Sequence, residues 1–306
     1  MTLAPIVTFV YNRLDHAEQL FTSLGKCDMA SESTLYIFSD GAKNEQGAAK
    51  VNAVREYINS DAVKSYFKEV RIIEAEKNKG LARSVISGVQ SVIDRYGKVI
   101  VIEDDNIVSK QLLKFMNTCL DRYANEKRVW SISGYTFEDN IVGTEEDVFF
   151  SGRPNSYLWG TWADRWMSVD WGVASYEKFK INPVRRHKFN RYGNDASGML
   201  DDQMIGNIDS WAIRFHYGCF LRGGFVVMPN KTYSINRGND GSGTHCKRSG
   251  VEDSRILYDE LKEYKLPLPY EDARVVKAYN KKTHRRLIYR VYRYLKTALL
   301  GVPDKK

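Results

Sequence analysis

The sequence has 306 residues, is 43% hydrophobic and carries a formal net charge of +8, so it allows one large or two modest globular domains. No apolar stretch approaches the length of a membrane span, and we expect no secretory signal peptide. The four cysteines form no closely spaced pair, and this spacing argues against a zinc ribbon or a disulfide framework and favours a reducing compartment. Residues 281–306 hold nine Lys/Arg and one Asp, so residues 1–280 are neutral with 37 charges of each sign. Because the excess of positive charge belongs to the tail and not to the folded body, we expect no nucleic-acid partner.

The first third of the chain alternates short apolar strands with amphipathic helices. Strands are predicted at residues 5–10, 35–38, 70–73 and 99–102. The helices between them are marked by apolar residues at helical spacing, and Asp15 is placed to cap the first helix. This alternation predicts an α/β fold with a parallel sheet and right-handed crossovers.

Polar residues follow each predicted strand. Arg13 follows the first, Asp40 the second, residues 78–83 the third, and residues 103–105 the fourth. Because the carboxyl ends of parallel strands meet at one edge of a sheet, we expect these groups to converge on one cleft.

The acids Glu103, Asp104 and Asp105 follow four consecutive aliphatic residues. Adjacent carboxylates repel one another, and a hard divalent cation such as Mg²⁺ or Mn²⁺ relieves that repulsion. The alternative is a solvated acidic turn after a core strand. No G-x-G-x-x-G follows the first strand and no G-x-x-x-x-G-K-[ST] occurs, so an NAD site and a P-loop nucleotidase are unexpected.

The second half of the chain is less regular. It predicts helices at 111–124 and 209–220, strands at 129–133 and 225–228, and a mobile glycine-containing loop within 230–246. No low-complexity linker interrupts the chain, so the two halves are expected to share a sheet. We divide the chain into a first half (1–108), a second half (109–270) and a basic amphipathic helix (271–306).

Several of these motifs together resemble metal-dependent glycosyltransferases of the GT-A fold, especially family 2. They are Asn12-Arg13, Ser39-Asp40-Gly41, the segment 78–83 (NKGLAR) and Glu103-Asp104-Asp105, which looks like the acidic "DxD" motif. The acids, and the later Asp209-Ser210-Trp211, are also similar to N-acetylglucosaminyltransferase I.

The resemblance implies that residues 1–108 are the nucleotide-sugar-binding half and residues 109–270 the acceptor-binding half of one GT-A domain. It also implies roles on the donor side of the site. Asp40 would bind the nucleobase with support from Arg13, and Arg83 would face the diphosphate. Within the acidic motif that begins at Glu103, Asp104 would bind the ribose.

The resemblance also implies a metal and a base. Asp105 would ligate Mn²⁺ or Mg²⁺ directly, His245 matches a metal-ligating histidine of many members, and Asp209 would be the catalytic base. Displacing a nucleoside diphosphate needs a cation for the leaving group and a carboxylate for the acceptor proton. Trp159 and Trp162 could hold the sugars, although a Trp cluster is more often core, and Asp40 or Asp209 could be turn or helix caps.

We therefore expect an inverting glycosyltransferase that moves a sugar from a nucleotide-sugar, most simply a UDP-sugar, to a glycan or glycolipid acceptor. A sugar-nucleotide pyrophosphorylase of related fold would need a glycine-rich loop where Tyr11-Asn12-Arg13-Leu14 stands. A third alternative is a glycan-binding protein that has lost catalysis.

The end of the chain has an amphipathic pattern. Seven apolar residues between Leu287 and Leu299 recur at helical spacing, and seven cations between Lys281 and Lys296 occupy much of the rest. This pattern favours an interfacial helix on an anionic membrane surface and a cytoplasmic, peripherally bound protein. The alternative is a terminal helix docked on the protein body.

Overall fold

The computed structural model describes residues 2–238, 255, 257–260, 263–283, 288, 291–292 and 294–295. His245, most of the predicted loop and most of the terminal segment lie outside these residues. No helix in the described ranges is both long and apolar enough to cross a membrane.

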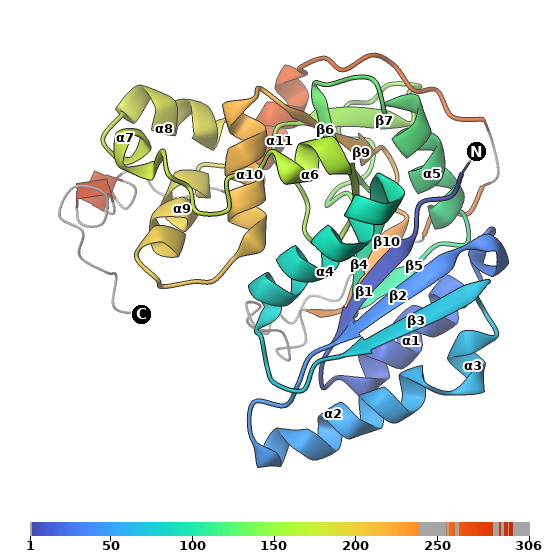
Figure 1. Cartoon of the computed structure of the whole chain (residues 1–306). Helices are drawn as coiled ribbons and strands as arrows, with labels where there is room; N and C mark the ends of the chain where they lie inside the picture. The colour runs from blue at the N-terminus through green and yellow to red at the C-terminus, as the bar shows by residue number, and fades with distance from the viewer. Residues whose placement is uncertain are drawn as a thin grey trace.

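One eight-stranded sheet forms the centre of the molecule (Figure 1). Its strands follow the order β3-β2-β1-β4-β8-β6-β9-β7. In chain order the strands are β1 (Ile6–Val10), β2 (Thr34–Ser39), β3 (Glu69–Glu74), β4 (Lys98–Glu103), β6 (Val129–Ser133), β7 (Val148–Ser151), β8 (Leu158–Trp162) and β9 (Phe225–Pro229).

The pairing of β1 with β2 and β4, and of β2 with β3, is parallel. β8 runs antiparallel between β4 and β6, and β6 pairs in parallel with β9. The predicted α/β fold with a mainly parallel sheet is therefore confirmed, and both halves of the chain contribute to one sheet. The parallel strands β1 to β4 bring their carboxyl ends to the same edge.

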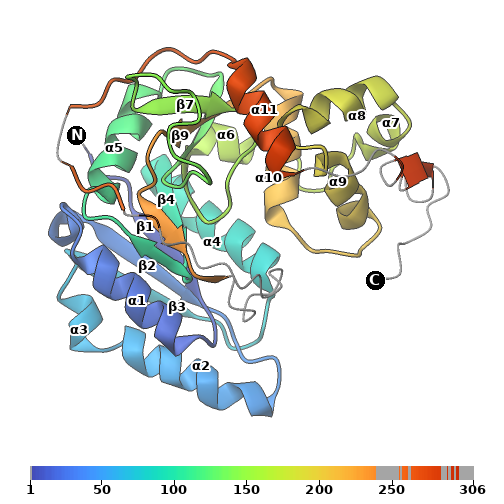
Figure 2. The same ribbon diagram turned by 180° about the vertical axis from the view of Figure 1, so that it is seen from behind.

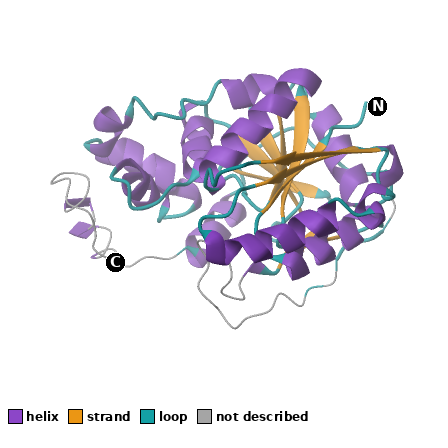
Figure 3. Ribbon diagram, turned by 60° about the horizontal axis from the view of Figure 1, so that its bottom comes forward, coloured by secondary structure: helices purple, strands orange, loops and turns teal. Residues whose placement is uncertain are grey.

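Helices cover both faces of the sheet (Figure 3). Alternate residues of β1 and β4 enter opposite hydrophobic clusters, as the period of a strand requires: Ile6, Ile100 and Ile102 lie in one, Val7 and Val101 in the other. Helices α1 (Leu14–Gly25), α2 (Glu45–Ile58), α3 (Asp61–Lys64) and α5 (Leu112–Arg122) pack on the first, and α4 (Leu81–Tyr96), α6 (Ala163–Met167) and α10 (Trp211–Leu221) on the second.

Helix α4 illustrates how the sequence determines these elements. Its buried residues Ala82, Val85, Val89 and Val92 recur at three- and four-residue spacing. The helix ends at Gly97, whose φ of 74° is in the left-handed region that glycine adopts without steric cost. Strand β4 follows at once, so this short turn directs the acids after β4 back to the edge that faces the start of α4.

The Trp residues of β8 belong to the core, and their prediction as a sugar-binding wall was wrong. Trp159 is 1% exposed and stacks on Trp166 at 5.4 Å between ring centroids. Trp162 is also buried, and its Nε1 donates to the backbone oxygen of Leu120 at 3.1 Å. Because β8 is an inner strand covered on both faces, its side chains in both directions enter the two hydrophobic layers.

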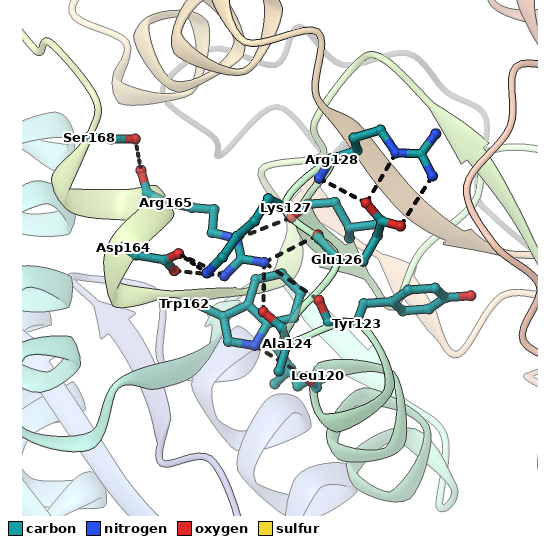
Figure 4. A network of polar contacts seen from close by, with 11 residues as sticks. Leu120, Tyr123, Ala124, Glu126, Lys127, Arg128, Trp162, Asp164, Arg165 and Ser168 are labelled. Atoms are coloured by element: carbon teal, nitrogen blue, oxygen red, sulfur yellow. Dashed lines mark hydrogen bonds and ion pairs between the residues drawn. The ribbon is translucent and has the colours of Figure 1, made fainter.

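A buried arginine holds the amino-terminal end of β6 to α6 (Figure 4). Arg165 is only 4% exposed, and its Nη2 donates to the backbone oxygens of Ala124 (2.8 Å) and Glu126 (3.2 Å). The guanidinium carbon lies 4.4 Å from the centre of the Trp162 ring, and Asp164 supplies the countercharge at 2.7 Å. This network satisfies a buried cation at the sheet edge opposite the acids, which is a structural role.

A helical lobe extends from α10 (Figure 2). It consists of α7 (Tyr176–Lys180), α8 (Pro183–Phe189), η2 (Asn190–Tyr192) and α9 (Ala196–Met204). Its own apolar cluster includes Phe179, Phe189 and Leu200, which pack on Ile213 and Tyr217 of α10. A short η1 (Ala30–Glu32) and a two-stranded sheet, β5 (Asn106–Val108) with β10 (Ser234–Asn236), complete the elements of residues 2–238.

The first part of the predicted terminal helix packs on the body. Helix α11 (Ala273–Lys282) buries Val275 and Tyr279 in a cluster with Phe149 and Met228. Asn280 donates to the backbone oxygen of Arg191 at 2.7 Å. Residues 273–282 therefore follow the docked alternative. The single amphipathic helix predicted over 271–306 is not confirmed, because few residues beyond 283 are described.

Candidate active site

A cavity of about 980 Å³ opens at the carboxyl ends of the parallel strands. Residues of both halves of the chain line it, from Tyr11 after β1 to Asp209 before α10 and Tyr279 on α11. The strand-end clusters predicted to converge do so: Arg13, Asp40, residues 78–80 and the three acids all line this cavity.

Asp40 fixes the loop at the end of β3. Its Oδ1 accepts hydrogen bonds from the backbone nitrogens of Gly41 (2.9 Å) and Lys79 (2.8 Å), and its Oδ2 accepts from that of Gly80 (3.0 Å). Gly80 has a φ of 78°, which a residue with a Cβ would adopt only with strain. The carboxylate thus acts as the cap that we considered as an alternative, while it also lines the cavity, and its contact with a nucleobase stays a prediction.

Arg83 is the strand-end residue that the structure does not bring to the cavity. It lies exposed in the first turn of α4, and the cavity lining from this helix consists of Leu81, Ser84 and residues further along. Lys43 and Lys79 are cations that do line the cavity. Lys79 belongs to the segment 78–83 that the sequence analysis singled out, whereas no motif distinguishes Lys43 from the many surface lysines.

The acids after β4 share one cation. Nη2 of Arg13 forms an ion pair with Oδ1 of Asp104 and lies 3.3 Å from Oδ2 of Asp105. Nη1 of Arg13 is also 3.3 Å from Oδ2 of Asp105, and Nε is 3.4 Å from Oδ2 of Asp104. Arg13, Asp104 and Asp105 thus lie in one cluster, as predicted. Arg13 contacts carboxylates here, and its support of a nucleobase stays a prediction.

Negative charge exceeds positive charge at this point of the site. Burial, with the repulsion of Asp105 and Asp104, raises the pKa of Glu103 well above its ordinary value. Burial also raises the pKa of Asp104, although Arg13 opposes that shift. The raised pKa values mean that the charged forms of these carboxyl groups are disfavoured here, and a cation bound beside them would favour those forms.

Asp105 is positioned from the second half of the chain. Strand β10 pairs antiparallel with β5, which sets Asn236 opposite Asn106. Nδ2 of Asn236 donates to Oδ1 of Asp105 at 2.7 Å, and a Cβ on Gly238 would collide with Oδ2 of Asp105. Sequence reasoning marked Gly238 only as part of a mobile loop and missed Asn236. His245 lies outside the described residues.

Asp209 lines the cavity just before α10. Its side chain is 67% exposed, and its Oδ1 accepts from Nη2 of Arg214 at 3.0 Å. The helix cap is the next residue, Ser210, whose Oγ accepts from the backbone nitrogen of Ile213 at 3.4 Å. Asp209 is therefore not the N-cap, and its carboxylate is available to a group in the cavity.

Two further lining residues were not predicted to act there. Arg153 forms a two-point ion pair with Asp195 at 2.6 and 3.1 Å, and a Cβ on Gly193 would collide with its guanidinium. His216 is buried next to this pair, and burial, with the charge of Arg153, lowers its pKa to about 3. Both come from segments whose sequence shows no motif.

The acidic residues present fit a divalent cation whose coordination is completed by a bound ligand. Among the described residues no group of three His, Cys, Asp or Glu side chains forms a metal site. However, Asp104 and Asp105 already bind one cation between them. Mg²⁺ typically takes one or two protein carboxylates and completes its coordination with substrate phosphates and water. Asp105, with Glu103 and Asp104 beside it, has the oxygen donors that Mg²⁺ and Mn²⁺ prefer.

No protein-family model matches the chain, and no curated protein matches it. Among solved structures, S. aureus TarS aligns with 76% of this chain at 11% identity and a TM-score of 0.44, and the chain covers 36% of TarS. The mannosyltransferase PcManGT from Pyrobaculum calidifontis, in complex with GDP-Man and Mn²⁺, aligns with 72% at 9% identity and a TM-score of 0.39, with 68% of its length covered. These similarities are too low to establish an activity.

Proposed function

We propose that this chain is an inverting, metal-dependent glycosyltransferase that moves a sugar from a UDP-sugar to a glycan acceptor. The observation that carries the proposal is that two carboxylate groups with different surroundings line one cavity. The acids after β4 lie with Arg13 at the carboxyl edge of the sheet, and Asp209 lies before α10 on the other half of the chain.

The donor occupies the side of the cavity next to β1, β2 and β4. Asp105, with Asp104 beside it, would hold the divalent cation, which would supply positive charge next to the leaving diphosphate. Arg13 and Lys79 line the same side and add positive charge there. Asp40 keeps the loop at Gly80 in place, so that the backbone next to the nucleotide is rigid.

The acceptor occupies the side next to α9, α10 and α11. Asp209 takes the proton of the attacking hydroxyl at its carboxylate oxygen, and Arg214 orients that carboxylate. A single base on the acceptor side favours one direct displacement, which inverts the anomeric configuration. Met199 and Ile208 line the cavity here, are partly exposed, and supply apolar surface for sugar rings on this side.

The acceptor in this proposal is lipid-linked, and the chain is peripherally bound to the cytoplasmic side of a membrane. Four described residues of the terminal segment, Ile288, Val291, Tyr292 and Leu295, carry exposed side chains at helical spacing. Residues 281–306 contribute the whole net charge of +8. This combination supports binding to an anionic lipid surface.

A screen of nucleotide-sugars for metal-dependent hydrolysis tests the activity. We expect release of nucleoside diphosphate from one donor with Mn²⁺ or Mg²⁺, and a β-configured product from an α-linked donor by NMR. A pyrophosphorylase would instead form nucleotide-sugar from sugar 1-phosphate and a nucleoside triphosphate. A glycan-binding protein without catalysis would bind oligosaccharides and ignore every nucleotide-sugar. Either of these two outcomes overturns the proposal.

A further inference from the structure

The helical lobe has an outer surface with exposed aliphatic side chains. Ile181, after α7, is 59% exposed, and Val184, in the first turn of α8, is 62% exposed. Helix α8 buries Arg186 and Phe189 and turns Val184 outward. Eleven large apolar side chains of the described residues are exposed, and six of them belong to this lobe or to residues 288–295. This concentration on one part of the molecule is a sign of an interaction site.

Basic side chains surround these two aliphatic residues. Lys178, Arg185 and Lys188 are exposed, and within the described part of the chain they form no ion pair. Lys188 is one turn of helix beyond Val184, and Lys178 is about one turn before Ile181. The other cations of the lobe are compensated, since Lys180, Arg186 and Arg191 pair with Glu177, Asp201 and Glu271. The surface therefore carries three positive charges without a counterion from those residues.

The terminal segment adjoins the same surface. The hydroxyl of Tyr294 donates to the backbone oxygen of Ile181 at 3.5 Å, and the Tyr294 ring lies 4.9 Å from the guanidinium carbon of Arg186. Val291 and Leu295 are exposed next to this contact in the sequence. Figures 1 and 2 show residues of this segment beside the lobe in both views. The apolar side chains of the two segments thus belong to one region.

The lobe is rigidly connected to the acceptor side of the cavity. Asp201 of α9 accepts two hydrogen bonds from Arg186 of α8, at 2.8 and 2.7 Å, and one from the hydroxyl of Tyr176 of α7 at 3.1 Å. The neighbouring Met199 and Asp202 of α9 line the cavity. The orientation of the lobe surface therefore determines the orientation of the acceptor side.

We propose that the outer face of α7 and α8, defined by Lys178, Ile181, Val184, Arg185 and Lys188, binds the anionic surface of a lipid bilayer. The cations contact lipid phosphates, and the two aliphatic side chains enter the boundary between headgroups and acyl chains. A nucleic acid or soluble polyanion would use the cations but would gain nothing from Ile181 and Val184. If the lobe binds lipid in this way, the acceptor side turns toward a lipid-linked acceptor, and this consequence rests on the proposed function.

Co-sedimentation of the full chain with vesicles tests this inference. Vesicles of phosphatidylcholine with phosphatidylglycerol should bind the protein, and vesicles of phosphatidylcholine alone should not. Replacing Lys178, Arg185 and Lys188 together by Gln should lower the partition coefficient about 100-fold. The double change Ile181→Ser and Val184→Ser should lower it about 10-fold. All these side chains are exposed, so the variants should fold.

Matched variants separate the lobe from general charge effects. Lys50, Lys64 and Lys68, replaced together by Gln, remove three exposed cations from the region of α2 and α3, at the other end of the molecule (Figure 1). Met167→Ser with Leu268→Ser removes two apolar side chains of equal exposure, 61% and 62%. Both controls should sediment like the wild type. The terminal segment is present in every variant, so differences belong to the lobe.

Three results would overturn the inference. Equal sedimentation of the lobe variants and the controls would show that the lobe does not contact lipid. Competition by a soluble polyanion combined with no effect of Ile181→Ser and Val184→Ser would indicate a different anionic partner. A wild-type dimer that the lobe variants dissociate would identify an interface between two copies. Metal-dependent hydrolysis of the nucleotide-sugar, measured on the same proteins, reports separately on the proposed function.

Discussion

Arg13 contacts both carboxylate oxygens of Asp104, with Nη2 in an ion pair to Oδ1 and Nε 3.4 Å from Oδ2. The same guanidinium reaches Asp105 at 3.3 Å. The cation that contacts Asp104 and Asp105 in this structure is therefore a side chain from the loop after β1, the strand next to β4. A divalent cation at Asp105 must compete with it or displace it.

Arg13→Gln should consequently bind Mn²⁺ more tightly in the absence of nucleotide, by about 10-fold, because removal of a competing charge is worth on the order of 1 kcal/mol at a partly solvated site. Electron paramagnetic resonance of free Mn²⁺ measures this affinity without any turnover. Arg71→Gln, a change on the outer strand β3 away from the cavity, is the matched control and should bind Mn²⁺ like the wild type. Weaker binding by Arg13→Gln would show that Arg13 orients the acids for the metal.

Asp209→Asn should reduce kcat by roughly 100-fold or more with little change in donor affinity, because an amide cannot accept the acceptor proton. Arg214→Gln removes the ion pair at 3.0 Å but keeps the carboxylate, so its effect should be much smaller. Steady-state kinetics with the donor found in the screen compares the two. Equal losses in both variants would mean that Asp209 serves only as the partner of Arg214.

Gly238→Ala should weaken Mn²⁺ binding, because the added Cβ would collide with the Asp105 carboxylate and displace it. The fold should remain, since the collision involves one side chain at a loop. Gly218→Ala in α10 meets its nearest neighbour at 3.4 Å and is the matched control. Thermal unfolding without Mn²⁺ measures the stability of the fold, and the shift in Tm on adding Mn²⁺ reports metal binding. A metal-induced shift in Tm that is the same for Gly238→Ala and the wild type would refute the positioning of Asp105 by this segment.

Acid should destabilise the protein through His216. Its pKa of about 3 in the folded protein lies below the ordinary value of 6.5, because of burial and the charge of Arg153, with Asp195 opposing the shift. The unfolded chain therefore binds a proton below pH 6.5 that the folded chain does not, and stability falls from pH 6.5 toward pH 3. At pH 5 the loss is about 2 kcal/mol.

His216→Phe retains a ring against Phe189, 4.6 Å away between centroids, but does not titrate. The free energy of unfolding of this variant should depend less on pH between 5 and 6.5 than that of the wild type. Urea denaturation at several pH values measures the slopes. Parallel slopes would show that His216 takes up a proton in the folded protein and that its surroundings are more polar than described.

The sequence predicted the sheet and the convergence of its strand ends because both depend on local patterns. An apolar run such as residues 99–102 specifies a buried strand, and alternation with helices specifies parallel pairing. Element boundaries were less certain: α1 begins at Leu14 with Arg13 at the N-cap position, so the predicted cap, Asp15, lies inside the first turn.

The remainder of the site depends on contacts between distant segments, which no local pattern contains. The pairing of β5 with β10 brings Asn236 to Asp105 across 131 residues, and Arg153 meets Asp195 across 42. The Trp residues of β8 were assigned to the cavity because their composition suits sugars, but the position of β8 between β4 and β6 places them in the core. The division at residues 108 and 270 and the roles of Arg83 and His245 stay predictions.

The most direct test of the account is a calorimetric titration of UDP into the wild type and Asp105→Asn, each with and without Mn²⁺. We predict that UDP binds the wild type only with Mn²⁺, and that Asp105→Asn loses this binding while it unfolds at the same temperature as the wild type. UDP affinity that is the same in all four titrations, or no affinity at all, would contradict a metal-assisted nucleotide-sugar site at these acids.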